Sequence, residues 1–271
     1  MIERFARFPR SLAEKSRLVR LGPGDIPALL AHPDWECPAP VVLWLHGRTV
    51  NKELDPGRYL RWIRAGIAAC AIDLPGHGER AESLFQDPAR TPELIHHLLP
   101  EIDQILHALA EPRFNGVFDL ERIGLGGMSA GGMATLRRLC DPHPFCCAAV
   151  EASTGNLGAL FHPDSGRPVP VDHSEQALDP VDPARHLETW RPIPLLALHS
   201  EADQSVPIAG MRSFIDDLKN HYADRGADPA MIEFVTWPET GADMEHAGFG
   251  RFANEAKNRQ VRFLRAHLLT D

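Results

Sequence analysis

The chain has 271 residues, of which 44% are hydrophobic, and its 28 Lys and Arg against 37 Asp and Glu give a net charge of −9 at pH 7. This composition allows a large core and predicts a single domain over residues 1–271. The acidic balance argues against nucleic acid or an anionic membrane as the main partner. Charges interrupt the first residues, and no later apolar run approaches the length of a membrane span. We therefore expect a cytoplasmic protein.

Apolar runs bounded by turn residues predict a series of buried strands, at residues 16–22, 26–33, 40–47, 66–73, 122–127, 145–153, 193–203 and 231–237. Helical periodicity predicts helices at 57–65, from Thr91 onward, after Ser129, at 208–224 and at 248–268. Pro100 falls inside the second of these and should kink or restart it. The alternation predicts an α/β fold, with a mostly parallel, twisted sheet of about eight strands and helices on both faces. Ligands should bind beyond the carboxyl ends of the strands.

Residues 158–190 break this alternation, because they are rich in Pro and Asp and poor in periodicity. The segment is too long for a simple turn. It lies between the strand that follows Ser129 and the next one, so it is a candidate lid insertion within the domain. The alternative is a solvated excursion with one short helix near 183–189.

Residues 124–134, GLGGMSAGGMA, place Ser129 among five glycines at a predicted strand-to-helix turn. A side chain on so sharp a turn needs neighbours without bulk, because the backbone there is strained and adjacent strands crowd it. The stretch from Gly127 to Gly131 fits the GxSxG nucleophile elbow, which presents a serine hydroxyl at the edge of the sheet. In the alternative, Ser129 only caps the following helix. Catalysis therefore depends on finding partners for the serine.

A serine hydroxyl is a poor nucleophile unless a base takes its proton and a third group orients that base. Asp203 follows a predicted buried strand, and His246 lies in the loop before the last predicted helix. The order Ser129, Asp203, His246 and its spacing leave room for a strand and a helix between successive members. Weaker alternatives stay open, with Glu201 or Asp243 as the acid and His199 or His77 as the base.

A tetrahedral intermediate also needs N–H donors for its oxyanion. We expect one from the backbone of Ala130, directly after the serine. The second should come from Arg48, in the loop after the 40–47 strand, with Thr49 as the alternative. The charged Arg48 side chain would then start beside the reacting carbonyl and favour short or polar acyl groups. Alternatively, it points to solvent or pairs with a carboxylate such as Glu53.

Five stretches in this order resemble the serine α/β-hydrolases, in particular the dienelactone-hydrolase-like and prolyl-oligopeptidase-like esterases: LHGRTVNKE, AIDLPGHGER, GGMSAGG, LHSEADQSVP and EHAGF. The similarity spans about residues 40–268. It implies an α/β-hydrolase fold and a carboxylesterase that cleaves a small-molecule ester through an acyl-enzyme on Ser129, with no cofactor. In two departures, Arg48 stands where such esterases often carry an apolar residue, and Ser129 replaces the cysteine of the dienelactone hydrolases proper. Asp73 and the glycines around it are expected to form a structural turn.

The same residues would serve a peptidase, thioesterase or acyltransferase, and these remain alternatives to an esterase. A non-catalytic small-molecule receptor is less favoured, because it has no need of every triad member. The sequence leaves the formation of a homo-oligomer open. No HExxH or CxxC spacing occurs among the 14 histidines and five cysteines, so no metal site is predicted. The cysteines should be reduced thiols.

Overall fold

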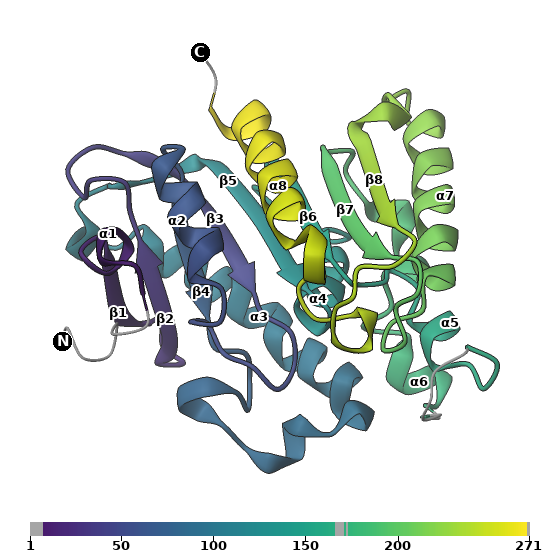
Figure 1. Cartoon of the computed structure of the whole chain (residues 1–271). Coiled ribbons are helices and arrows are strands. Elements are labelled where there is room, and N and C mark those ends of the chain that lie inside the picture. The colour runs from purple at the N-terminus through teal and green to yellow at the C-terminus, as the bar shows by residue number, and fades with distance from the viewer. Residues whose placement is uncertain (1–7, 166–170, 172, 270–271) are drawn as a thin grey trace.

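One eight-stranded sheet runs through the computed structural model, which describes residues 8–165, 171 and 173–269 (Figure 1). The strands are β1 (Ser16–Leu21), β2 (Ile26–Ala31), β3 (Ala39–Leu45), β4 (Ala68–Ile72), β5 (Phe118–Met128), β6 (Cys147–Glu151), β7 (Leu195–Ser200) and β8 (Ile232–Trp237). Their order in the sheet is β1-β2-β4-β3-β5-β6-β7-β8. β2 is antiparallel to β1 and β4, and the pairs from β4 to β8 are parallel. The predicted α/β fold is confirmed.

Helices cover both faces of the sheet (Figure 1). They are α1 (Arg10–Ala13), α2 (Pro56–Arg64), α3 (Thr91–Leu109), α4 (Ala130–Arg138), α5 (Leu157–Phe161), α6 (Glu175–Leu178), α7 (Ile208–Asp224) and α8 (Ala253–Leu268). In β3, Val42 and Trp44 pack with side chains of α2 and α8, whereas Leu43 and Leu45 belong to the core on the α3, α4 and α7 side. Both faces of this strand are therefore apolar, which explains its uninterrupted hydrophobic run.

A kink or a restart was expected at Pro100, and the restart does not occur, because helix α3 continues through this residue. Proline removes only one N–H from the helix, and tertiary packing stabilises the remainder. Leu94, Leu98 and Ile102 on this helix are fully buried. The last helix begins at Ala253 rather than 248, because a 3₁₀ turn over Gly250–Phe252 precedes it.

A buried ion pair joins the turn after β4 to the loop after β3. Lys52 Nζ lies 2.8 Å from Asp73 Oδ2 and 2.7 Å from Glu79 Oε1, and the Lys52 N–H donates to Asp73 Oδ1 at 3.0 Å. The Lys52 and Asp73 side chains are both buried. Gly78 has φ +56°, and a Cβ there would come within 2.1 Å of the Asp73 carboxylate. The contacts give Asp73 a structural role, as expected for this turn.

Lys52→Met should lower the free energy of unfolding by about 3 kcal/mol, because it leaves two carboxylates without their buried cation. Urea unfolding of the variant measures the loss. Lys219→Met on α7 is the matched control, since Lys219 forms no ion pair with any residue that the structure describes. The control should change stability by no more than about 0.5 kcal/mol. Equal losses in the two variants would contradict a special role for the Lys52 pair.

Candidate active site

Ser129 forms the turn between β5 and α4 and has φ 53° and ψ −122°, a strained conformation for a residue with a side chain. Its N–H donates to the Glu151 carbonyl on the neighbouring strand at 2.9 Å. A Cβ on Gly131 would lie 2.2 Å from the Leu45 carbonyl oxygen, and one on Gly127 would lie 2.5 Å from the Gly131 backbone. The glycines therefore let the start of α4 pack against the ends of β3 and β5. The Ser129 hydroxyl makes no capping hydrogen bond, in contrast to the helix-cap alternative.

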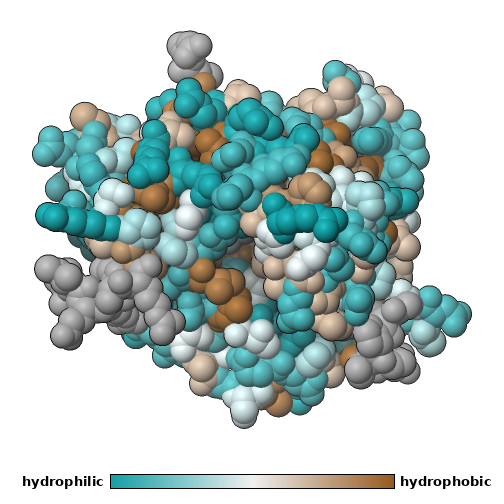
Figure 2. Space-filling model, in the orientation of Figure 1, coloured by the Kyte–Doolittle hydropathy of each residue, from teal (hydrophilic) through white to brown (hydrophobic). Residues whose placement is uncertain are grey.

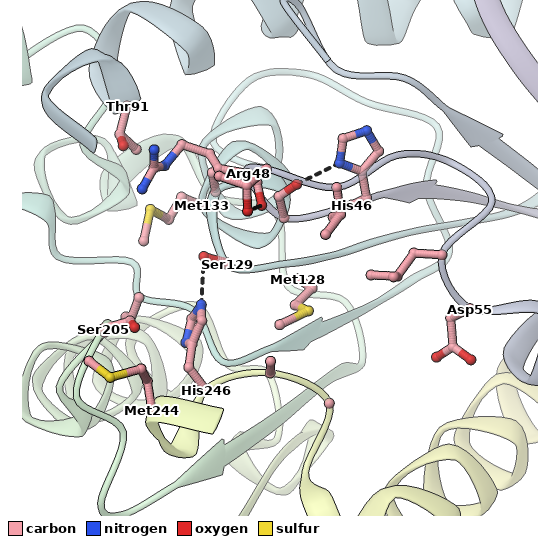
Figure 3. Close-up of a pocket in the computed structure, with 18 of the residues that line it drawn as sticks. His46, Arg48, Asp55, Thr91, Met128, Ser129, Met133, Ser205, Met244 and His246 are labelled. Carbon is pink, nitrogen blue, oxygen red and sulfur yellow. Dashed lines mark hydrogen bonds between the residues drawn. The ribbon is translucent and has the colours of Figure 1, made fainter. Parts of the chain in front are cut away.

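The structure brings Ser129, His246 and Asp203 into one chain of hydrogen bonds. Ser129 Oγ lies 3.0 Å from His246 Nε2 (Figure 3), and His246 Nδ1 lies 2.8 Å from Asp203 Oδ2. The other oxygen of Asp203 accepts the N–H groups of Ser205 and Val206 at 2.9 and 2.8 Å. The Asp203 side chain is buried, which keeps water from competing for this carboxylate. In this arrangement the imidazole can take the serine proton while the carboxylate holds the ring in place.

The alternative acids and bases have other partners. Glu201 Oε1 lies 3.1 Å from Arg212 Nη2, and the Asp243 residue is exposed to solvent. His199 and His77 are buried, and a ring nitrogen of each contacts a backbone carbonyl. Burial lowers the pKa of both histidines below the ordinary value. The hydrogen bonds therefore favour His246 and Asp203 as the partners of the serine.

The loop after β3 lies against the serine. Gly47 is packed so closely that a Cβ on it would lie 3.3 Å from Ser129 Cβ. His46 accepts the Leu74 N–H on Nε2 at 3.1 Å, so Nδ1 carries the ring proton and donates to the Gly47 carbonyl at 2.6 Å. Burial lowers the pKa of His46 to about 4, so the ring is neutral at pH 7. His46 thus fixes the direction of the peptide between Gly47 and Arg48.

The Arg48 side chain extends along the cavity toward Thr91 and Met133 (Figure 3). Its Nη1 donates to the Gln86 carbonyl at 2.8 Å. The guanidinium therefore forms part of the cavity wall and lies on the Thr91 side of Ser129.

A cavity of about 670 Å³ opens at Ser129. Met133 and Asp55 lie on opposite sides of the serine (Figure 3). The Asp55 carboxylate forms ion pairs with Lys257 Nζ at 3.0 Å and with Arg58 Nη2 at 3.2 Å. Leu160 and Phe161 of α5 also line the cavity. One side of the cavity is therefore charged, although the charges are largely paired with one another.

The face of the molecule seen in Figure 2 is mostly hydrophilic, with only small apolar patches. In the described part of the chain, three large hydrophobic side chains are exposed, Leu54, Leu84 and Met244. Two of them, Leu54 and Met244, line the cavity. The exposed apolar side chains of the described residues are therefore found mainly at the cavity.

The segment 158–190 reaches the cavity through the end of α5. The buried Asp182 carboxylate accepts the N–H groups of Leu157 and Gly158 at 2.8 and 2.9 Å, which ties the end of this segment to its beginning. The expected short helix near 183–189 is a pair of 3₁₀ turns, Pro183–Arg185 and Leu187–Thr189. The structure does not describe residues 166–170 and 172, which lie within the candidate lid.

A model of the prolyl oligopeptidase family matches residues 59–269. The chain belongs to the prolyl oligopeptidase family. The matched region contains Ser129, Asp203 and His246, whereas the loop that carries Arg48 precedes it. Membership of this serine hydrolase family confirms the sequence resemblance and makes the chain an enzyme.

Individual relatives agree with this assignment. The chain is 27% identical over 211 residues to the putative esterase YitV of Bacillus subtilis strain 168, covering 72% of this chain and 80% of the relative. It is 27% identical over 260 residues to the esterase YjfP of Escherichia coli K12, covering 90% and 96% of the two chains. The crystal structure of TT1662 from Thermus thermophilus superposes with a TM-score of 0.69 at 22% identity, over 94% of this chain and 99% of that one. The similarity to TT1662 shows that the two chains share the same fold.

No helix in the described ranges is long and apolar enough to cross a membrane. Nor do three or more His, Cys, Asp or Glu side chains gather there in a way that could hold a metal ion.

Glu245 was not among the residues predicted for the site. It precedes His246 and accepts hydrogen bonds from Ser200 and Thr240. Ser200 is 45 residues away in the chain. Asp243 lies two residues before Glu245 and carries the same charge, so no local sequence pattern distinguishes Glu245 from Asp243. Only the packing of the two loops identifies Glu245.

Proposed function

We propose that the protein is a serine hydrolase that cleaves carboxylic esters, with Ser129, His246 and Asp203 as its catalytic triad. The observation that carries the proposal is the continuous chain of hydrogen bonds from Ser129 Oγ through His246 to the buried Asp203 carboxylate. Ser129 and His246 line the cavity. The strained Ser129 backbone supports it, because strain in native structures clusters at active sites. Family membership and two relatives named as esterases support the same activity.

In the proposed mechanism His246 Nε2 takes the hydroxyl proton as Ser129 Oγ attacks the ester carbonyl. The carbon–oxygen double bond becomes an oxyanion, and collapse of this intermediate expels the alcohol, which receives the proton from His246. Water then attacks the acyl-enzyme by the same route and releases the acid. Asp203 holds His246 with Nδ1 protonated throughout, so Nε2 is free to accept the serine proton.

The N–H groups of Ala130 and Arg48 are our candidates for binding the oxyanion. Ala130 is the first residue of α4, and the first N–H groups of a helix have no partner within it. The Gly47 carbonyl points to His46, and the described chain has no cis peptide bond. In a trans peptide the N–H points opposite to the carbonyl, so the Arg48 N–H faces away from His46. We keep Arg48 as the second donor, with Thr49 as the alternative.

A panel of chromogenic esters, thioesters and aminoacyl amides tests the proposal. We expect the highest kcat/KM with a small ester. Faster cleavage of the amides would instead favour a peptidase, which the family also includes, and faster cleavage of thioesters a thioesterase. Transfer of the acyl group to an added alcohol would indicate an acyltransferase. If none of these compounds is turned over, the proposal is overturned and the non-catalytic small-molecule receptor is favoured instead.

We expect a preference for acyl chains of about two to four carbons and no activation at an oil–water interface, because Arg48 places a charge on the cavity wall. Arg48→Ala should raise the ratio of kcat/KM for long-chain esters to kcat/KM for short-chain esters about tenfold, because it removes that charge and widens the cavity. Measuring kcat/KM over a series of chain lengths in both proteins decides this. An unchanged ratio would exclude the side chain from specificity and leave its backbone N–H as a donor. Faster turnover of long chains by the unmodified enzyme would contradict the short-chain preference.

The organisation of the chain also remains a proposal. We infer one domain over 1–271, in which the segment 158–190 forms one side of the cavity through α5 and is anchored by Asp182. A cytoplasmic location and a small-molecule ester as the main partner are further expectations. A measurement of the mass of the protein in solution tests whether it forms a homo-oligomer.

A further inference from the structure

The Glu245 carboxylate is the centre of a dense group of hydrogen bonds in the loop before α8. Its Oε2 accepts the Thr240 N–H at 2.6 Å, the Thr240 hydroxyl at 2.7 Å and the Ser200 hydroxyl at 2.8 Å. Its Oε1 accepts the Gly241 N–H at 2.6 Å. The four donors fill most of the lone-pair positions of a carboxylate. The Thr240 donors are the main cause that lowers the pKa of Glu245 to about 2, so the group is ionised at neutral pH.

These bonds connect the two loops that carry His246 and Asp203. Ser200 is the last residue of β7, three residues before Asp203, and Glu245 directly precedes His246. The Gln204 N–H also donates to the Met244 carbonyl, at 3.1 Å. The hydrogen bonds from Ser200 to Glu245 and from Gln204 to Met244 therefore lie on either side of the one between Asp203 and His246. A shift of either loop would change the distance between the imidazole and the carboxylate.

The backbone of the His246 loop needs such support. Met244 has φ 50° and ψ 20°, and Glu245 has φ 53°, so two successive residues with side chains lie in the left-handed region. Non-glycine residues rarely adopt this region and do so where surrounding contacts hold them. Thr240 is fully buried, so its donors are fixed within the fold rather than in solvent.

We propose that Glu245 is a positioning residue, whose ionised side chain holds the His246 loop against the end of β7 and thereby sets the hydrogen bonds of His246 to Ser129 and Asp203. The inference rests on the proposed serine hydrolase function. Glu245 itself does not touch the reacting atoms in this proposal. Its effect should therefore appear in the rate of the chemical step and not in substrate binding.

The test compares Glu245→Gln and Glu245→Ala with the unmodified enzyme. Glutamine keeps the shape of the side chain, but its NH₂ group faces N–H donors where the carboxylate had an acceptor. We expect kcat to fall about tenfold in Glu245→Gln and about a hundredfold in Glu245→Ala, with KM within about twofold, because a displacement near 1 Å costs about that much. Asp243→Asn is the matched control, since it removes the same charge from the same turn at an exposed position, and its kcat should stay within about threefold of the original.

A second measurement reads the loop without turnover. Proton NMR of the unmodified enzyme should show the Nδ1 proton shared by His246 and Asp203 far downfield. The resonance should broaden or disappear in Glu245→Ala and persist in Asp243→Asn, with thermal melts confirming that each variant is folded. An unchanged resonance, or an equal loss of kcat in Asp243→Asn, would overturn the positioning role. If no substrate is turned over by the unmodified enzyme, the proposed function fails, while the resonance still decides whether Glu245 positions His246.

Discussion

Ser129→Ala should fold as the unmodified protein does and lose about a millionfold in kcat, the scale on which coupled triads respond to loss of one member. Alanine removes only the oxygen that would attack the carbonyl. The backbone of residue 129 is held by its N–H bond to Glu151 and by the packing of Gly127 and Gly131, none of which involves the hydroxyl. The fold and the remaining site should therefore persist.

Single-turnover kinetics with a chromogenic ester, together with mass spectrometry for a covalent acyl group, measures this loss. The unmodified enzyme should accumulate or transiently form an adduct on Ser129, and the variant should form none. Ser205→Ala is a control, because Ser205 also lines the cavity but lies outside the proposed triad. A Ser129→Ala variant that keeps a tenth of the original kcat would remove Ser129 from its proposed role.

Asp203→Asn should lower kcat about ten-thousandfold while leaving the imidazole in place. One oxygen of residue 203 accepts two backbone N–H groups, so an asparagine would keep its oxygen there and turn its NH₂ toward His246. Nδ1 of His246 would then have to accept, and its proton would move to Nε2. In that tautomer Nε2 cannot accept the proton of Ser129.

Two further variants make this prediction specific to Asp203. Glu201→Gln and Asp243→Asn each remove a carboxylate near the same loops, and both should stay within about threefold of the original kcat, as expected for groups outside the triad. Steady-state kinetics at pH 8 on all three proteins makes the comparison. If either control is more damaging than Asp203→Asn, the acid of the proposed triad is wrong.

Local sequence patterns predicted the strands and most of the longer helices and singled out Ser129 as a candidate. The apolar runs predicted each of the eight strands to within a few residues. For β2, β3, β4, β6 and β7 the reason is that strands buried on both faces have a continuous hydrophobic sequence. The glycines around Ser129 mark the turn for a similarly local reason, since Gly127 and Gly131 have no room for a side chain. The helix does not restart at Pro100, because the packing of α3 outweighs one missing hydrogen bond.

The sequence favoured Asp203 as the acid but left Glu201 and Asp243 open as alternatives. Glu201 and Asp203 both follow β7, and Asp243 lies close to His246 in the chain. The structure distinguishes them by distance, because one Asp203 oxygen lies 2.8 Å from His246 while Glu201 pairs with Arg212. Such a distinction depends on side-chain directions that spacing along the chain does not contain.

The sequence by itself determined the alternating strands and helices and the sharp turn at Ser129, because each depends on residues close together in the chain. It also gave the order of the serine, acid and histidine, because each of them follows a predicted strand. The tertiary structure alone decided the strand order, the direction of the peptide at Arg48 and the contacts of Glu245 with Ser200 and Thr240. These features depend on hydrogen bonds between loops that are far apart in sequence. Their geometry exists only once the sheet has brought the carboxyl ends of its strands to one edge.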